Sequence, residues 1–163
     1  MRIETAKTDG DIKKLAELAD IIWHEHFSSI LTIGQIDYMV EKFQSYTAIK
    51  KAIENDGYRY YMAYEDDELC GYLGIHDEGG GVIFISKVYV RRDKRGRGIA
   101  SELLEKLRED HPDSEKWYLT VNRYNTSSIA VYEKRGFKIT RTQVTDIGSG
   151  YVMDDYIMER EFI

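Results

Sequence analysis

The pattern of apolar and polar positions predicts helices in the first third of the chain. In residues 11–27, apolar side chains recur at intervals of three and four positions: Ile12, Leu15, Leu18, Ala19, Ile22 and Trp23. This period brings them onto one face of a helix. Residues 33–44 and 45–56 also have helical character, so we expect a second helix in two pieces, ended by Gly57.

Aromatic and β-branched residues then dominate three short segments, residues 58–64, 69–76 and 82–90. The stretches EDDE and DEGGG separate these segments, which is typical of turns between antiparallel strands. Residues 82–90 are apolar at both sets of alternating positions. This segment is therefore expected to be a central strand of the sheet, covered on both faces.

The second half of the chain alternates helices and strands. Apolar positions in residues 99–107 predict a helix. Residues 126–135 predict a shorter helix, with Asn125 or Thr126 as its cap and Gly136 as its stop. The remaining strands are expected at residues 116–121, 137–144 and 151–159. The order of elements predicts a mixed α/β sheet, mostly antiparallel, with helices on both faces.

Length and composition favour one ordered domain over residues 1–163 in the cytoplasm. A chain of 163 residues can bury a core without metals or disulfides, and it contains one proline and no internal repeat. Cys70 is the single cysteine, so no internal disulfide can form. The first residues do not resemble a signal peptide. No segment approaches the roughly twenty apolar residues of a membrane-spanning helix, so we expect no membrane partner.

Charge is unevenly distributed along the chain. The formal net charge is -6, yet residues 91–97 contain five cations and one acid, a local charge of +4. A compact basic cluster on an acidic protein suits a small polyanion better than a nucleic acid, which needs a wide basic surface. We therefore expect no nucleic acid partner. The alternative interpretation is a run of solvated surface charges.

The sequence R-G-R-G-I-A at residues 95–100 follows the central strand and opens a helix. The first amides of a helix lack internal partners and carry partial positive charge, so they can bind a phosphate. Gly96 and Gly98 would let an anion approach closely, and residues 94–98 contain no serine, threonine, aspartate or asparagine to cap the helix. The alternative is a glycine-rich turn with surface arginines, because short glycine motifs are weak evidence.

The segment also nearly matches the dinucleotide fingerprint G-x-G-x-x-G. Ser101 stands where the third glycine belongs, no acid lies at the end of the next strand, and the segment follows an antiparallel meander. An NAD(P)-dependent enzyme is therefore the less favoured hypothesis. No P-loop sequence is present.

Two motifs in order resemble the GNAT family of N-acetyltransferases. Arg95, Gly98 and Ala100 match its R/Q-x-x-G-x-G/A acyl-CoA signature. Residues 121–137 resemble its later signature, in which a strand ends near an asparagine and the next helix carries a tyrosine before Gly-Phe. The resemblance covers residues 58–163 through motifs and element order, and the N-terminal helices by position only.

The resemblance implies an acetyl-CoA cofactor and a set of residues that bind it. The strands at residues 82–90 and 116–121 would splay apart, with the pantetheine arm between them. Main-chain groups of Val88, Tyr89 and Val90 would hold the arm, and Asn125 and Ser128 would contact it from the other side. The pyrophosphate would bind the main-chain amides of Arg95, Gly96, Arg97, Gly98, Ile99, Ala100 and Ser101.

Acetyl transfer to an amine needs a base for the amine and an acid for the departing thiolate. Tyr132 is the expected acid, because a phenol of pKa about 10 stays protonated at pH 7; the alternative is a packed aromatic side chain. Many relatives carry a glutamate before the loop, but Ser86 and Lys87 stand here. The remaining candidates for the base, each also explicable as an ordinary polar residue, are His24, Glu25, His26, His76, Asp154 and Asp155.

The acceptor is expected to be a small cationic amine. Residues 142–163 carry a net charge of -4, and the W-H-E-H-F end of the first predicted helix looks like polyamine-acetylating members of the family. We therefore take His24, Glu25 and Asp154 as acceptor-site candidates. A peptide N-terminus, a lysine side chain, an amino sugar or an amino acid stays possible, because acceptor pockets vary on a shared scaffold.

Two further expectations concern metal and assembly. H-E-H is not a zinc signature, because residues two apart on a helix point to different sides, so no metal is expected. We expect a monomer or a homodimer. A module that senses acyl-CoA without catalysis is the alternative to an enzyme, favoured by the missing glutamate.

Overall fold

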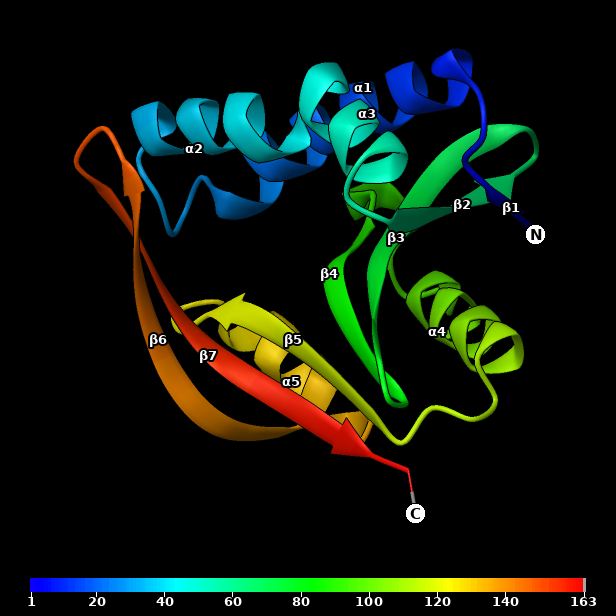
Figure 1. Ribbon diagram of the computed structural model, residues 1–163. Coiled ribbons are helices and arrows are strands. Elements are labelled where there is room, and N and C mark those ends of the chain that lie inside the picture. Colours follow the sequence, from blue (N-terminus) through cyan, green and yellow to red (C-terminus); the bar gives the residue numbers. More distant parts are fainter. Residues whose placement is uncertain (163) are drawn as a thin grey trace. The chain divides into compact units, whose positions relative to one another are not determined.

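A computed structural model gives the fold and describes residues 1–162. Seven strands follow the hydrogen-bonded order β1-β2-β3-β4-β5-β7-β6. Four neighbouring pairs, β1 with β2, β2 with β3, β5 with β7 and β6 with β7, are antiparallel, and β4 pairs with β5 in parallel. This confirms the mixed, mostly antiparallel α/β class (Figure 1).

The chain forms two compact units. The first contains Met1–His76 and Lys87–Pro112, and the second contains Asp77–Ser86 and Asp113–Ile163. The single domain stays a prediction.

In the first unit, helix α1 (Asp9–Phe27) begins two residues before the predicted segment. Thr8 caps it, and its hydroxyl accepts a hydrogen bond from the amide of Asp11, 3.0 Å away. The Asp11 carboxylate in turn accepts a hydrogen bond from the Thr8 amide, a reciprocal cap that fixes the start of the helix. The strand β1 (Arg2–Thr5) before it was not predicted, because four residues with alternating exposure contain no apolar run.

The predicted second helix is present in two pieces, α2 (Ile33–Met39) and α3 (Tyr46–Glu54). A π-helix (Val40–Gln44) joins them, and Ser45 is extended at φ -73° and ψ 162°. The Ser45 hydroxyl accepts a hydrogen bond from the Ala48 amide and so caps α3.

Strands β2 (Tyr58–Glu65) and β3 (Glu68–Gly79) pair antiparallel over most of their length. Alternate residues of β2 pack into a core with α1 and α3, among them Tyr60, Met62 and Tyr64. Tyr61 points to the opposite face, where its hydroxyl donates to Asp110 at the end of α4 (Ile99–Asp110), 2.8 Å away. Helices therefore cover both faces of this part of the sheet, as predicted.

Strand β4 (Val82–Val90) has the predicted limits. In the second unit, its residues Val82–Ile85 pair with Lys116–Leu119 of β5 (Lys116–Asn122). The sequence analysis expects β4 and β5 to splay apart beyond these paired residues. This separation involves both units, and it stays a prediction.

The rest of the second unit follows the predicted order. Helix α5 (Thr126–Lys134) begins after Asn125, whose side chain accepts a hydrogen bond from the Ser128 amide. Strands β6 (Lys138–Gly148) and β7 (Tyr151–Glu161) form the long twisted hairpin drawn in orange and red in Figure 1. Strand β7 lies between β5 and β6, so both of its edges are paired.

Candidate functional site

The loop between β4 and α4 has the backbone that an anion site needs. Gly96 and Gly98 have φ values of +79° and +78°, a region that other L-residues rarely adopt. Apart from the glycine itself and its two flanking residues, no heavy atom of residues 1–162 lies within 4 Å of the position that a Cβ would take at Gly96 or Gly98, so the space at both positions is open. Glycine is thus required here by backbone conformation, while the open space leaves room for a ligand.

Among the residues that the structure describes, no side chain caps the start of α4. Its N-cap is Gly98, and the first helical hydrogen bond runs from the Glu102 amide to the Gly98 carbonyl at 3.0 Å. The amides of Ile99, Ala100 and Ser101 precede that bond and have no carbonyl one turn earlier in the helix. These amides fit a bound phosphate, and the cofactor contacts stay a prediction.

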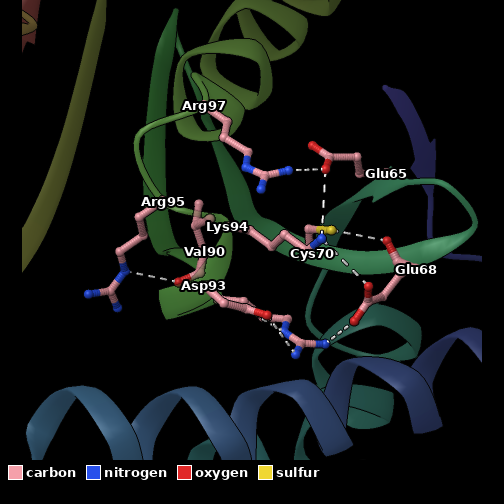
Figure 2. A network of polar contacts seen from close by, with 9 residues as sticks. Glu65, Glu68, Cys70, Val90, Asp93, Lys94, Arg95 and Arg97 are labelled. Carbon is pink, nitrogen blue, oxygen red and sulfur yellow. Dashed lines mark hydrogen bonds and ion pairs between the residues drawn. The ribbon is translucent and has the colours of Figure 1, made fainter.

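The basic cluster within this loop, residues 91–97, is partly neutralised by two acids that flank the turn between β2 and β3 (Figure 2). Glu65 forms ion pairs with Arg97 and with Lys94, the latter at 3.7 Å. Glu68 pairs with Lys94 at 3.7 Å and with Arg91. The local charge of +4 derived from residues 91–97 alone therefore overstates the positive charge at the loop.

Arg92 and Arg95 differ from the other cations of the cluster. Arg92 donates to the main-chain carbonyl of Glu25, 2.9 Å away, and Arg95 donates to the carbonyl of Val90, 3.2 Å away. Burial lowers the pKa of the Arg95 guanidinium, as does the nearby charge of Arg92. Among residues 1–162, neither arginine forms an ion pair with a carboxylate, so these are the cations whose charge is available to an anionic ligand.

Removing Glu65 tests whether it competes with a bound phosphate. In Glu65→Gln, Arg97 and Lys94 lose a carboxylate while the loop backbone stays, since a partly exposed ion pair contributes only about 0–1 kcal/mol. We expect coenzyme A to bind about 2- to 5-fold more tightly at low salt. Isothermal titration calorimetry would measure the change. The gain should disappear at high salt, because ions screen exposed charges.

Asp67→Asn is the matched control, because Asp67 pairs with Arg2 instead of the loop. Its affinity for coenzyme A should equal that of the wild type. Weaker binding by Glu65→Gln would show that Glu65 positions the loop and does not compete with the ligand.

Gly71 of β3 supports the site and was not found from the sequence. A Cβ at this position would lie 2.8 Å from the Tyr89 carbonyl oxygen and 3.3 Å from side-chain atoms of Val90 and Ile99. The missing side chain therefore allows the end of β4 and the start of α4 to approach β3. A glycine inside an otherwise apolar strand is the signal that could have indicated this close approach.

The end of α1 lies next to the basic cluster, as the contact between Arg92 and Glu25 shows. His26 Nδ1 is 3.5 Å from the Arg95 guanidinium. His24 contacts Asp37 of α2 at 2.6 Å, and this hydrogen bond is the main cause of its raised pKa. A histidine that prefers its protonated form is a poor base, and the acceptor roles of His24 and Glu25 stay predictions.

The side chain of Lys87 in β4 contacts the π-helix. Its ammonium donates to the main-chain carbonyl of Phe43, 2.9 Å away, and to the hydroxyl of Tyr60. Burial lowers the pKa of Lys87 to about 8. Lys87 lies near the position at which many members of the resembled family carry a glutamate, and here it provides a titratable amine instead. The sequence signal for this group is a single lysine in an otherwise apolar strand.

This pKa predicts how stability depends on pH. The unfolded lysine keeps its proton to about pH 10.4, whereas the folded one loses it near pH 8, so the folded state gains relative stability between these values. From pH 7 to pH 10, the unfolding free energy of the wild type should rise by about 1–3 kcal/mol relative to Lys87→Met. Urea denaturation at several pH values measures this. Lys51→Met removes an exposed lysine and keeps Lys87. The difference in unfolding free energy between this variant and the wild type should therefore be the same at every pH.

In the second unit, Asn125 is the cap of α5 that the sequence allowed, and it is almost fully buried. Its Oδ1 accepts from the Ser128 amide at 3.4 Å, which brings two of the predicted cofactor residues together. Their contact with the cofactor stays a prediction, and capping can coexist with it.

Tyr132 is half-buried on α5, and its ring lies edge-on to Phe137 with centroids 5.9 Å apart. Burial raises the pKa of its phenol. The hydroxyl therefore stays protonated well above neutral pH and can donate a proton or a hydrogen bond. Its role as the acid stays a prediction.

Asp154 of β7 is already paired. Its carboxylate lies 3.1 Å from Arg123 Nε, without the alignment of a hydrogen bond, and its carbonyl accepts from the Arg123 amide at 3.0 Å. This pairing reduces its capacity to bind an acceptor, although that role is untested. In residues 1–162, no three histidine, cysteine, aspartate or glutamate side chains gather in a way that could hold a metal ion.

Residues 15–137 match the family model described as Acetyltransferase (GNAT) family. The peptidyl-lysine N-acetyltransferase YjaB of Salmonella typhimurium strain LT2 is 33% identical over 88 residues, 53% of this chain and 55% of the relative. The match thus spans about half the length of this curated relative. Within the described part of the chain, no helix is both long and apolar enough to cross a membrane.

Solved structures share the fold. PaiA N-acetyltransferase from Thermoplasma acidophilum, in complex with coenzyme A, superposes with a TM-score of 0.80 at 21% identity, over 99% of this chain and 100% of that one. Ribosomal-protein-alanine N-acetyltransferase from Brucella melitensis gives a TM-score of 0.71 at 21% identity, again over 99% and 100%. At 21% identity, the similarity to these structures shows a shared fold and nothing beyond the fold.

Proposed function

Because this chain belongs to the GNAT acetyltransferase family, we propose that it transfers an acetyl group from acetyl-CoA to a primary amine. The observation that carries the proposal is the uncapped start of α4 behind two left-handed glycines, Gly96 and Gly98, with open space in front of them. A diphosphate would fit these amides, and Arg92 and Arg95, which pair with no carboxylate among residues 1–162, would add positive charge.

Acetyl-CoA would supply an activated thioester, and the chain would bind and orient the reactants. The amides from Arg95 to Ser101 would hold the pyrophosphate, and the main chain of Val88–Val90 would hold the pantetheine arm. The amine would attack directly, within a complex of both substrates. As the carbon–sulfur bond breaks, Tyr132 would donate its hydroxyl proton to the departing sulfur, and the proton that the attacking nitrogen loses would return to the Tyr132 oxygen, directly or through water.

The proposed acceptor is a small cationic amine of the polyamine class. Support comes from the excess of acidic residues in the C-terminal stretch and from the polar end of α1 beside the basic cluster. The second candidate is a lysine side chain in a peptide, favoured by the peptidyl-lysine acetyltransferase that matches part of this chain.

Thiol release from acetyl-CoA, measured over a panel of amines, tests the proposal. The panel should contain spermidine, putrescine, a lysine peptide, a peptide with a free N-terminus and an amino sugar. Turnover of polyamines above the other amines would support the proposed acceptor. Tight coenzyme A binding with no turnover of any amine would instead select the non-catalytic sensing module.

A further inference from the structure

Asp155 is a buried carboxylate in the middle of β7. The residue is 5% exposed, and the next residue on the same face of the strand, Ile157, is 6% exposed. Within residues 1–162, the Asp155 carboxylate takes part in no hydrogen bond and no ion pair. An ionised carboxylate without a partner is costly to bury, so most buried acids have one.

Two other acids of the same strand, Asp154 and Glu159, show the contrast. Asp154 lies next to Arg123, and Glu159 pairs with Lys116 at 2.8 Å. Burial raises the pKa of Asp155 to about 6, and the neighbouring Asp154 adds to the effect. Asp155 is therefore still largely ionised at pH 7, and its negative charge is not compensated by the described chain.

The ladder surrounds Asp155 with two amide side chains. Asn122 of β5 and Gln143 of β6 lie opposite it in register, and directly paired residues point to the same face of a sheet. Asn122 Oδ1 accepts from the Tyr124 amide, and Gln143 Nε2 donates to Thr145, which leaves the Gln143 carbonyl oxygen as an acceptor. The three side chains of Asn122, Asp155 and Gln143 form a row across the sheet that combines one carboxylate with two amide oxygens. Such a row suits a group with several N–H donors.

We infer that Asp155 binds an alkylammonium group of the acceptor, with Asn122 and Gln143 beside it. This inference rests on the proposed function and specifies that the negative charge of Asp155 recognises the positive charge of the acceptor. An alkylammonium ion carries three donors and one positive charge, so it compensates the carboxylate and matches the oxygen row. The group could belong to a polyamine or to a lysine side chain.

The test is calorimetric titration of the wild type and Asp155→Asn with spermidine and with a lysine amide. We expect the better of the two ligands to bind at least tenfold more weakly to Asp155→Asn. Stronger wild-type binding of spermidine would indicate a polyamine source, and stronger binding of the lysine amide a peptide source. Equal affinity of wild type and variant, or no binding of either ligand to the wild type, would overturn the inference.

Glu161→Gln is the matched control, because it removes the same charge from an exposed position of the same strand. It should bind both ligands as the wild type does. Coenzyme A affinity should be unchanged in both variants, so a failure of the proposed cofactor site would be recognised separately. Carbon NMR of the Asp155 carboxyl gives a second readout, since a bound ammonium must lower its pKa.

Discussion

Tyr132→Phe is expected to lower kcat about 100-fold and to leave the affinity for coenzyme A unchanged. A positioned general acid contributes roughly 100- to 10,000-fold, and the lower end applies where water can replace it in part. Burial raises the pKa of this phenol above its usual value of about 10, so the wild-type hydroxyl stays protonated from pH 7 to pH 9. The rate ratio between wild type and variant should therefore be constant over this range, measured as thiol release at saturating substrates.

Tyr124→Phe is the control for this prediction, since Tyr124 lies just before α5 and is 65% exposed. It should retain full activity. If Tyr132→Phe turned over at the wild-type rate, Tyr132 would be a packing residue against Phe137 and another group would protonate the thiolate.

Gly98→Ala is expected to weaken coenzyme A binding about 10- to 100-fold. The left-handed backbone at φ +78° disfavours a side chain by about 1–2 kcal/mol, and the new methyl group would enter the open space in front of the helix start. Loss of one charge-assisted hydrogen bond between an amide and a phosphate costs a further 1.5–3 kcal/mol or so. The backbone strain is present with and without the ligand, so it lowers stability, whereas calorimetry with coenzyme A measures the loss of the hydrogen bond, which by itself corresponds to about 10- to 100-fold.

Gly150→Ala separates backbone strain from ligand contact. Gly150 has φ +79° and open space around it, but it lies in the turn between β6 and β7. In thermal unfolding, Gly150→Ala should lose about as much stability as Gly98→Ala. Its affinity for coenzyme A should equal that of the wild type. An equally small loss of binding in both variants would contradict the anion site at α4.

Periodicity and local chemistry were sufficient to predict most helices and strands. The limits of β4 were correct because nine successive residues with apolar positions on both faces belong in the centre of a sheet. The cap at Asn125 and the helix start after Gly98 were also readable, because capping depends on residues within one turn. Strand β1 was missed because its stability comes from pairing with β2, not from its own composition.

The sequence by itself therefore determined the local elements, the glycine loop at α4 and the family resemblance, all of which depend on neighbouring residues. Only the tertiary structure decided which charges are compensated. It placed Glu65 and Glu68 against the basic loop, enclosed the amine of Lys87 and buried Asp155, whose carboxylate has no partner among residues 1–162. Burial and pairing depend on residues far apart in the chain, and they set pKa values and available charge, which spacing along the sequence does not reveal.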